Sequence, residues 1–186
     1  MTHELERRTF LGMAISAFPI AVLGQSTATP DLSHAIRVPD GEDRTGSHHA
    51  IGLSSTDYKV LTKDSNGSFF LFQHTSTKKG GPPRHLHHGQ EEWFYVLQGD
   101  YIAEVGSDRY QLKAGDSLLA PREVPHAWAF VGSTLGKMLV GFTPANKMEA
   151  FFEATIKRLG PGKYPSEADV FHDHGMELVG PPLTVG

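Results

Sequence analysis

Residues 81–99 read GPPRHLHHGQEEWFYVLQG, and the rest of the chain is best interpreted around them. His85 and His87 are two residues apart, a spacing that puts both imidazoles on the same face of a β-strand. After a short polar loop, Glu92 begins an apolar run. Two imidazoles and a carboxylate this close together are typical of a metal site, and another imidazole, His126, follows later in the chain.

These residues resemble the two sequence motifs of the cupin superfamily, and the resemblance covers roughly residues 80 to 130. It implies an all-β fold, a small antiparallel jelly-roll β-barrel. It also implies one bound divalent metal ion. Fe, Mn, Ni, Co and Zn all suit mixed nitrogen and oxygen ligands. The family spacing selects Glu92 over Glu91. The matching residues are His85, His87, Glu92 and Gly99 in the first motif and Gly115, Pro121 and His126 in the second, and the implied metal ligands are His85, His87, Glu92 and His126.

Two positions depart from the family pattern. Glu123 stands where the family usually has Gly, and Phe130 stands where it usually has Asn. Glycine adopts positive φ angles easily and glutamate does not, so the first departure bears on the turn before His126. Neither position is a metal ligand in the family.

Length and composition favour one globular domain. The chain has 186 residues and a net charge of −4, and its 20 Gly and 12 Pro suit many short strands and turns. No basic patch is present, which argues against a nucleic-acid partner. The chain contains no cysteine, which excludes disulfides and thiolate ligands.

Residues 1–28 resemble a twin-arginine export signal. Arg7 and Arg8 precede an apolar run from Leu11 to Leu23, and small residues follow up to Ala28. A transmembrane anchor is the alternative, but the run is shorter than the roughly 20 residues that a bilayer requires. We therefore expect cleavage after Ala28, a periplasmic or secreted protein, and no membrane association afterwards.

The remaining chain divides into four parts. Residues 29–50 are polar and predict an extended arm, in which the adjacent His48 and His49 are read as exposed imidazoles. Residues 51–143 alternate apolar runs with turn residues and predict the barrel. Residues 144–160 predict a C-terminal helix, with Thr143 as N-cap and Pro144 at its first position. Residues 161–186, which contain His172 and His174, predict a solvated tail.

The strand that begins at Glu92 is apolar on both faces, so we expect both to be buried. Trp93, Tyr95 and Leu97 share the face opposite to Glu92. This outward row is expected to pack under another sheet or under a partner subunit, the second of which would make a homodimer.

Aromatic residues at inward positions predict a dry substrate cavity around the metal. Trp128 and Phe130 share a strand face with His126, and Phe94 shares one with Glu92. His74 is a lone His on such a face, and a His in that position is more often a wall or core residue than a metal ligand. Phe151 and Phe152 are read as core packing. The predicted pocket residues are Phe72, His74, Phe94, Trp128 and Phe130.

Three functions are compatible with this site. The first is a metal-dependent dioxygenase that acts on a small aromatic or enol substrate with dioxygen, and residues 144–153 also resemble the tail of single-domain cupins similar to quercetin dioxygenases. In this reading Glu92 is the catalytic base. The second is a non-oxidative isomerase or lyase, in which the metal polarises a carbonyl. The third is a small-molecule binding module without turnover.

Overall fold

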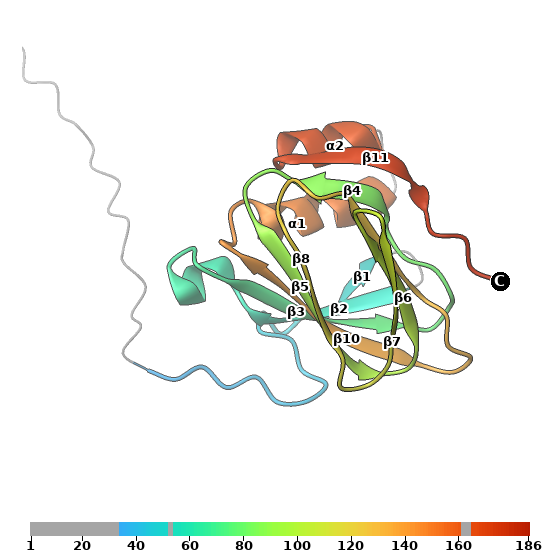
Figure 1. The fold of residues 1–186 in the computed structure, drawn as a ribbon. Coiled ribbons are helices and arrows are strands. Elements are labelled where there is room, and N and C mark those ends of the chain that lie inside the picture. The colour runs from blue at the N-terminus through green and yellow to red at the C-terminus, as the bar shows by residue number, and fades with distance from the viewer. Residues whose placement is uncertain (1–33, 52–53, 161–164) are drawn as a thin grey trace, which may run out of the picture.

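The computed structural model of the chain describes residues 34–51, 54–160 and 165–186. These residues form two antiparallel sheets that face each other as a jelly-roll barrel (Figure 1). The predicted all-β cupin-type fold is confirmed. The predicted export signal at residues 1–28 lies outside the described residues.

The six-stranded sheet has the order β1-β2-β3-β10-β5-β8, and the five-stranded sheet has the order β11-β4-β9-β6-β7. Strands far apart in the chain are therefore neighbours, as in β3, β10 and β5. The strands are β1 (His49–Ile51), β2 (Ser54–Val60), β3 (Phe70–Ser76), β4 (Pro83–His87), β5 (Glu91–Gln98), β6 (Tyr101–Val105), β7 (Asp108–Leu112), β8 (Ser117–Ala120), β9 (His126–Phe130), β10 (Gly136–Thr143) and β11 (Met176–Pro182).

The core lies between the two sheets and is rich in aromatic rings. Alternation along each strand sends every second side chain into this space, so the barrel is filled by residues of both sheets. Burial of each such large side chain contributes roughly 1.5–3 kcal/mol. The most deeply buried large hydrophobic side chains are Tyr58, Phe70, Phe94, Tyr101, Phe130, Met138, Phe142, Met148 and Met176.

Strand β5 is buried on one face only. Phe94 and Val96 are inside the barrel, whereas Trp93 and Tyr95 are half-buried and Leu97 is 40% exposed. The prediction that both faces are buried is therefore wrong for the single chain, because no further layer of the described residues covers this side of the six-stranded sheet. A partner subunit over this row stays a prediction.

The predicted C-terminal helix begins later than expected. Helix α1 spans Met148–Leu159, and its N-cap is Lys147. Thr143 is not the cap, because it is still paired with Glu91 at the end of β10. Asn146 then adopts a φ of 44°, in the left-handed region, which keeps the backbone out of a helix until Met148.

The prediction of a solvated tail at residues 161–186 is wrong for most of that segment. Helix α2 (Glu167–Asp173) is capped by Ser166, whose hydroxyl accepts a hydrogen bond from the Asp169 amide, and strand β11 extends the five-stranded sheet. In Figure 1, α1, α2 and β11 lie together at one end of the barrel. Phe171 is buried, so this segment belongs to the core.

The two histidines predicted to lie in the solvated tail, His172 and His174, differ in solvent exposure. The side chain of His172 is 90% exposed. His174 is half-buried, and its Nδ1 donates to the Val170 carbonyl oxygen at 2.7 Å.

The N-terminal arm is tied to the six-stranded sheet. The buried Asp43 accepts a hydrogen bond from the Tyr58 amide at 2.6 Å. Burial opposes ionisation, but hydrogen bonds from Thr45 and Tyr58 hold the pKa of Asp43 below its usual value. The predicted arm ends too late, because His49 already belongs to β1 and stacks on Tyr58 with ring centroids 4.2 Å apart. His48 is exposed, as expected.

A short 3₁₀ helix, η1 (Thr62–Ser65), connects β2 and β3. Neither α-helix of the described residues is long and apolar enough to span a membrane.

Candidate metal centre

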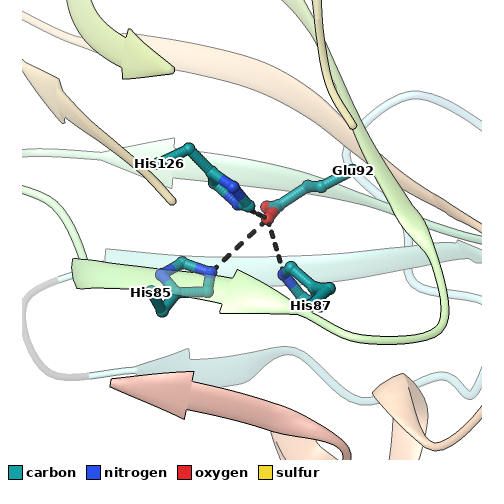
Figure 2. A group of neighbouring side chains, drawn as sticks. All are labelled: His85, His87, Glu92 and His126. Atoms are coloured by element: carbon teal, nitrogen blue, oxygen red, sulfur yellow. Dashed lines mark hydrogen bonds and ion pairs between the residues drawn. The ribbon is translucent and has the colours of Figure 1, made fainter. Parts of the chain in front are cut away.

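Three imidazoles and one carboxylate converge between the two sheets. His85 and His87 lie on β4, and His126 lies on the neighbouring β9 directly opposite His85. Glu92 comes from β5 in the other sheet. Figure 2 shows the three rings pointing toward the Glu92 carboxylate. Sheet pairing thus brings together residues that the chain separates.

The donor atoms are close enough to share one ion. Glu92 Oε2 lies 3.6 Å from His85 Nε2, 3.0 Å from His87 Nε2 and 2.9 Å from His126 Nε2. Each of the four residues offers a ligand atom within 4.8 Å of the others. All four residues are at least 95% buried, since their exposures range from 1% to 5%.

Backbone carbonyls orient two of the rings. His85 Nδ1 donates to the Pro83 carbonyl oxygen at 2.8 Å, and His126 Nδ1 donates to the Val124 carbonyl oxygen at 2.9 Å. A proton held on Nδ1 leaves the Nε2 lone pair for a metal, the usual arrangement of ligating histidines.

A side-chain amide contacts the remaining ring, and this residue was not among the site residues predicted from sequence. Gln90 is 2% exposed, and its Nε2 lies 3.1 Å from His87 Nδ1. Asn146 Nδ2 donates to Gln90 Oε1 and to the Gly89 carbonyl oxygen, both at 3.0 Å. The signal available in the sequence was that Gln90 is a polar residue in the loop between His87 and Glu92. Its partner Asn146 could not be predicted, because the two residues are 56 positions apart in the sequence.

The electrostatics of the cluster favour a cation. Burial raises the pKa of Glu92, but hydrogen bonds from the three imidazoles outweigh burial and hold it well below its usual range. Burial lowers the pKa of His87. Burial also opposes protonation of His126, yet the bond to Glu92 outweighs it and raises the pKa of His126. The carboxylate is therefore ionised, and a positive charge beside it is stabilised.

The donor set fits a divalent metal ion. With Nδ1 of His126 protonated, a neutral ring would turn an Nε2 lone pair toward the Glu92 oxygen 2.9 Å away, which is repulsive. Either an extra proton or a cation must lie between them. An ion bound by His85, His87, Glu92 and His126 would satisfy all four buried groups, and this set of nitrogen and oxygen ligands suits Fe, Mn, Ni, Co or Zn.

The turn before His126 accommodates the unusual Glu123. Its φ is 63°, in the left-handed region that glycine adopts most easily. The Glu123 amide donates to the His87 carbonyl oxygen at 2.8 Å, and its side chain lies 3.1 Å from His88. Glu123 therefore adopts a backbone conformation that glycine favours.

Three of the four metal ligands border a largely apolar cavity of about 420 Å³, and His126 does not line it. Phe72, His74 and Trp128 line it, as predicted from their inward positions. His85, His87 and Glu92 form part of the same wall, so a ligand in the cavity has access to a bound ion.

Phe94 and Phe130 do not line the cavity, and their prediction as pocket residues is wrong. Both point inward, but Phe130 lies four residues beyond His126, about 13 Å along the strand. There it packs against Tyr101, with ring centroids 5.4 Å apart, in the filled end of the barrel. Phe94 packs against Trp128 at 6.5 Å and belongs to the core that supports it.

Apolar lining residues also come from α1 and from the segment that follows it. Phe151 and Phe152 of α1 line the cavity, although the sequence indicated only core packing. Phe171 and Met176 line it as well, and the Phe171 ring lies 5.3 Å from the His85 ring. The Ser166–Asp169 capping pattern before two apolar residues was a signal for this part of the wall.

Comparison with known proteins supports the same class. Residues 73–142 match the family model described as a cupin domain. An uncharacterised protein of Methanocaldococcus jannaschii is 29% identical over 55 residues, 30% of this chain and 44% of that protein. The match thus spans less than half the length of this curated relative.

Two solved structures are similar in fold. An RmlC-like cupin from Shewanella frigidimarina is 22% identical, with a TM-score of 0.50 over 63% of this chain and 96% of that chain. A predicted oxalate decarboxylase from Thermotoga maritima is 17% identical, with a TM-score of 0.46 over 49% and 80%. The domain match and the cupin-like fold support the cupin superfamily for this chain, and its buried His/Glu cluster fits a divalent metal site.

Proposed function

We propose that this protein is a metal-dependent dioxygenase that acts on a small aromatic or enol substrate, similar to quercetin dioxygenases. One observation carries the proposal: two of the three imidazoles, His85 and His87, and the Glu92 carboxylate border a cavity walled by aromatic rings. The cavity volume of about 420 Å³ lies in the range of small-molecule sites.

His85, His87, Glu92 and His126 would hold the ion. When bound, a divalent ion acts as a Lewis acid toward a substrate oxygen and stabilises its negative charge. The surrounding rings exclude water, so charges in the cavity interact more strongly than in bulk solvent.

Glu92 is placed to accept the proton of a substrate hydroxyl. Its Oε2 contacts the three imidazoles, whereas its Oε1 takes part in no hydrogen bond among the described residues. The carboxylate is ionised at neutral pH, and a substrate hydroxyl made more acidic by a bound ion would pass its proton to Oε1. General-base assistance of this kind is typically worth about 10²–10⁴ in rate.

The cavity walls favour a flat, apolar ligand. Trp128, Phe72 and Phe152 present aromatic surface, and the Phe72 and Phe152 rings meet edge to face with centroids 4.6 Å apart. An aromatic or enol substrate would bury its rings here while its hydroxyl faces the ligand cluster.

The test follows the conversion of a flavonol under air and under argon by wild type, Glu92→Gln and Glu91→Gln. Glu92→Gln keeps the shape and a coordinating oxygen but removes the base, so we expect turnover to fall by about 10²-fold or more. Glu91→Gln is the matched control, because Glu91 points outward to Arg122 at 2.6 Å and should leave turnover intact.

Oxygen-dependent conversion by wild type and by Glu91→Gln, but not by Glu92→Gln, supports the dioxygenase. Equal conversion under argon would move the function to the isomerase or lyase class. A failure to convert any phenol or enol with any of the five metals would leave a binding module.

A further inference from the structure

We propose that His74 is a recognition residue of this cavity, which hydrogen-bonds a second oxygen of the ligand away from the metal ligands. The ligand class is then an aromatic or enol compound with a further hydroxyl or carbonyl group. This inference rests on the proposed function for the ligand's aromatic character, but not for the role of the imidazole.

His74 is the buried polar residue of the cavity that the ion site does not use. It lies on β3, is 9% exposed, and its ring meets Trp128 edge to face with centroids 4.9 Å apart. Apart from the metal ligands, the other lining side chains with hydroxyl or charged groups are half-buried or exposed at the rim. These are Ser54, Lys78, Lys79, Thr155, Arg158 and Glu167.

One of the two ring nitrogens of His74 has no hydrogen-bond partner among the described residues. Nδ1 lies 3.2 Å from Ser76 Oγ, which is itself buried. Among the described residues, Nε2 makes no hydrogen bond. His74 lines the cavity, and the described residues supply no partner for this nitrogen, so a ligand in the cavity can supply one.

The imidazole is neutral at physiological pH, because burial lowers the pKa of His74 from 6.5 to about 4. A neutral ring whose Nδ1 is occupied offers one donor or one acceptor at Nε2, depending on the tautomer. A hydroxyl group both donates and accepts, so it satisfies either tautomer. A carbonyl satisfies the tautomer with the proton on Nε2.

The test compares two probes, quercetin and 3-hydroxyflavone, which differ in the hydroxyl groups on their outer rings. Binding to the zinc-loaded protein under argon is measured by quenching of tryptophan fluorescence. We expect wild type to bind quercetin about tenfold or more tightly than 3-hydroxyflavone, and His74→Leu/Ser76→Ala to lose most of that ratio. His74→Gln, which keeps a hydrogen-bonding group, should keep part of it.

The matched control is His172→Leu, which removes an imidazole that is 90% exposed. It should leave the ratio of affinities unchanged. The same ratio in wild type and in His74→Leu/Ser76→Ala would overturn the inference.

A second measurement does not depend on the ligand. If Nε2 is unpaired for the sake of a ligand, removing both polar groups leaves the ligand-free protein at pH 7 at least as stable as wild type in urea unfolding. A structural role for His74 predicts the opposite, a clear loss of stability, and that result would overturn the inference. If neither probe binds wild type, the substrate class of the proposed function fails, and the stability comparison decides the role of His74 alone.

Discussion

The buried imidazole of His74 predicts a specific dependence of stability on pH. Burial lowers its pKa from 6.5 to about 4 in the folded protein, so between these values the unfolded chain binds a proton that the folded protein does not. Stability from this residue is therefore complete above pH 6.5 and falls as the pH drops toward 4. At pH 5 the loss is about 1.5 pH units times 1.36 kcal/mol, or roughly 2 kcal/mol.

Other groups also titrate in this range, so the measurement is a difference between two proteins. Urea unfolding of wild type and His74→Leu/Ser76→Ala is followed at pH 7 and pH 5 with zinc in fixed excess. The metal ligands contribute equally to both proteins. We expect the stability of wild type relative to the variant to fall by roughly 2 kcal/mol on acidification.

A relative stability that is the same at pH 7 and pH 5 would refute this reasoning. It would mean that the His74 ring is protonated as easily in the folded protein as in the unfolded chain. The imidazole would then be hydrated or charge-paired, and not a neutral group in a dry wall.

Three further predictions follow from the site, the C-terminal segment and the N-terminus. Gln90→Ala should weaken zinc affinity about 10- to 100-fold in a chelator competition, because the amide contacts a ligating imidazole; unchanged affinity would remove Gln90 from the site. Phe171→Ala should lower the free energy of unfolding by about 3 kcal/mol, whereas the neighbouring exposed His172→Ala should not change it; equal urea midpoints would show that α2 does not stabilise the barrel. Replacing Arg7 and Arg8 by Lys should keep the protein in the cytoplasm on cell fractionation, and normal export would discard the twin-arginine prediction.

The ligand set could be predicted from sequence because its first half is local. Strand periodicity places His85 and His87 on one face, whereas the choice of Glu92 over Glu91 after the short loop came from the spacing of the cupin motif. His126 depends on long-range pairing, since it lies opposite His85 across two strands 41 positions apart in sequence. Its assignment came from the resemblance to the cupin motifs, and periodicity could not supply it.

The cavity wall was predicted less well, for a physical reason. Alternation tells which side chains point inward, but not whether they meet empty space or other side chains. Trp128 and Phe130 share a strand face, yet one lines the cavity and the other fills the closed end of the barrel. That difference depends on how the opposite sheet packs.

The C-terminal segment was missed because its structure is non-local. β11 is a strand only through pairing with β4, in which Met176 lies opposite His87. Local sequence shows only four residues, Met176–Val179, between Gly175 and Gly180, with two prolines directly after. Edge strands of this kind gain their stability from the neighbour that they cover, and their own residues give a weak signal.

The most direct test of the central claim is metal stoichiometry. Wild type, His85→Ala, His126→Ala and the control His172→Ala are dialysed against limiting zinc, and bound metal is determined by elemental analysis. We predict one equivalent in wild type and in the control and a large loss in the other two, together with a lower thermal midpoint, because metal binding stabilises the folded state. Equal metal content in all four proteins would contradict the assignment of His85, His87, Glu92 and His126 as one metal centre.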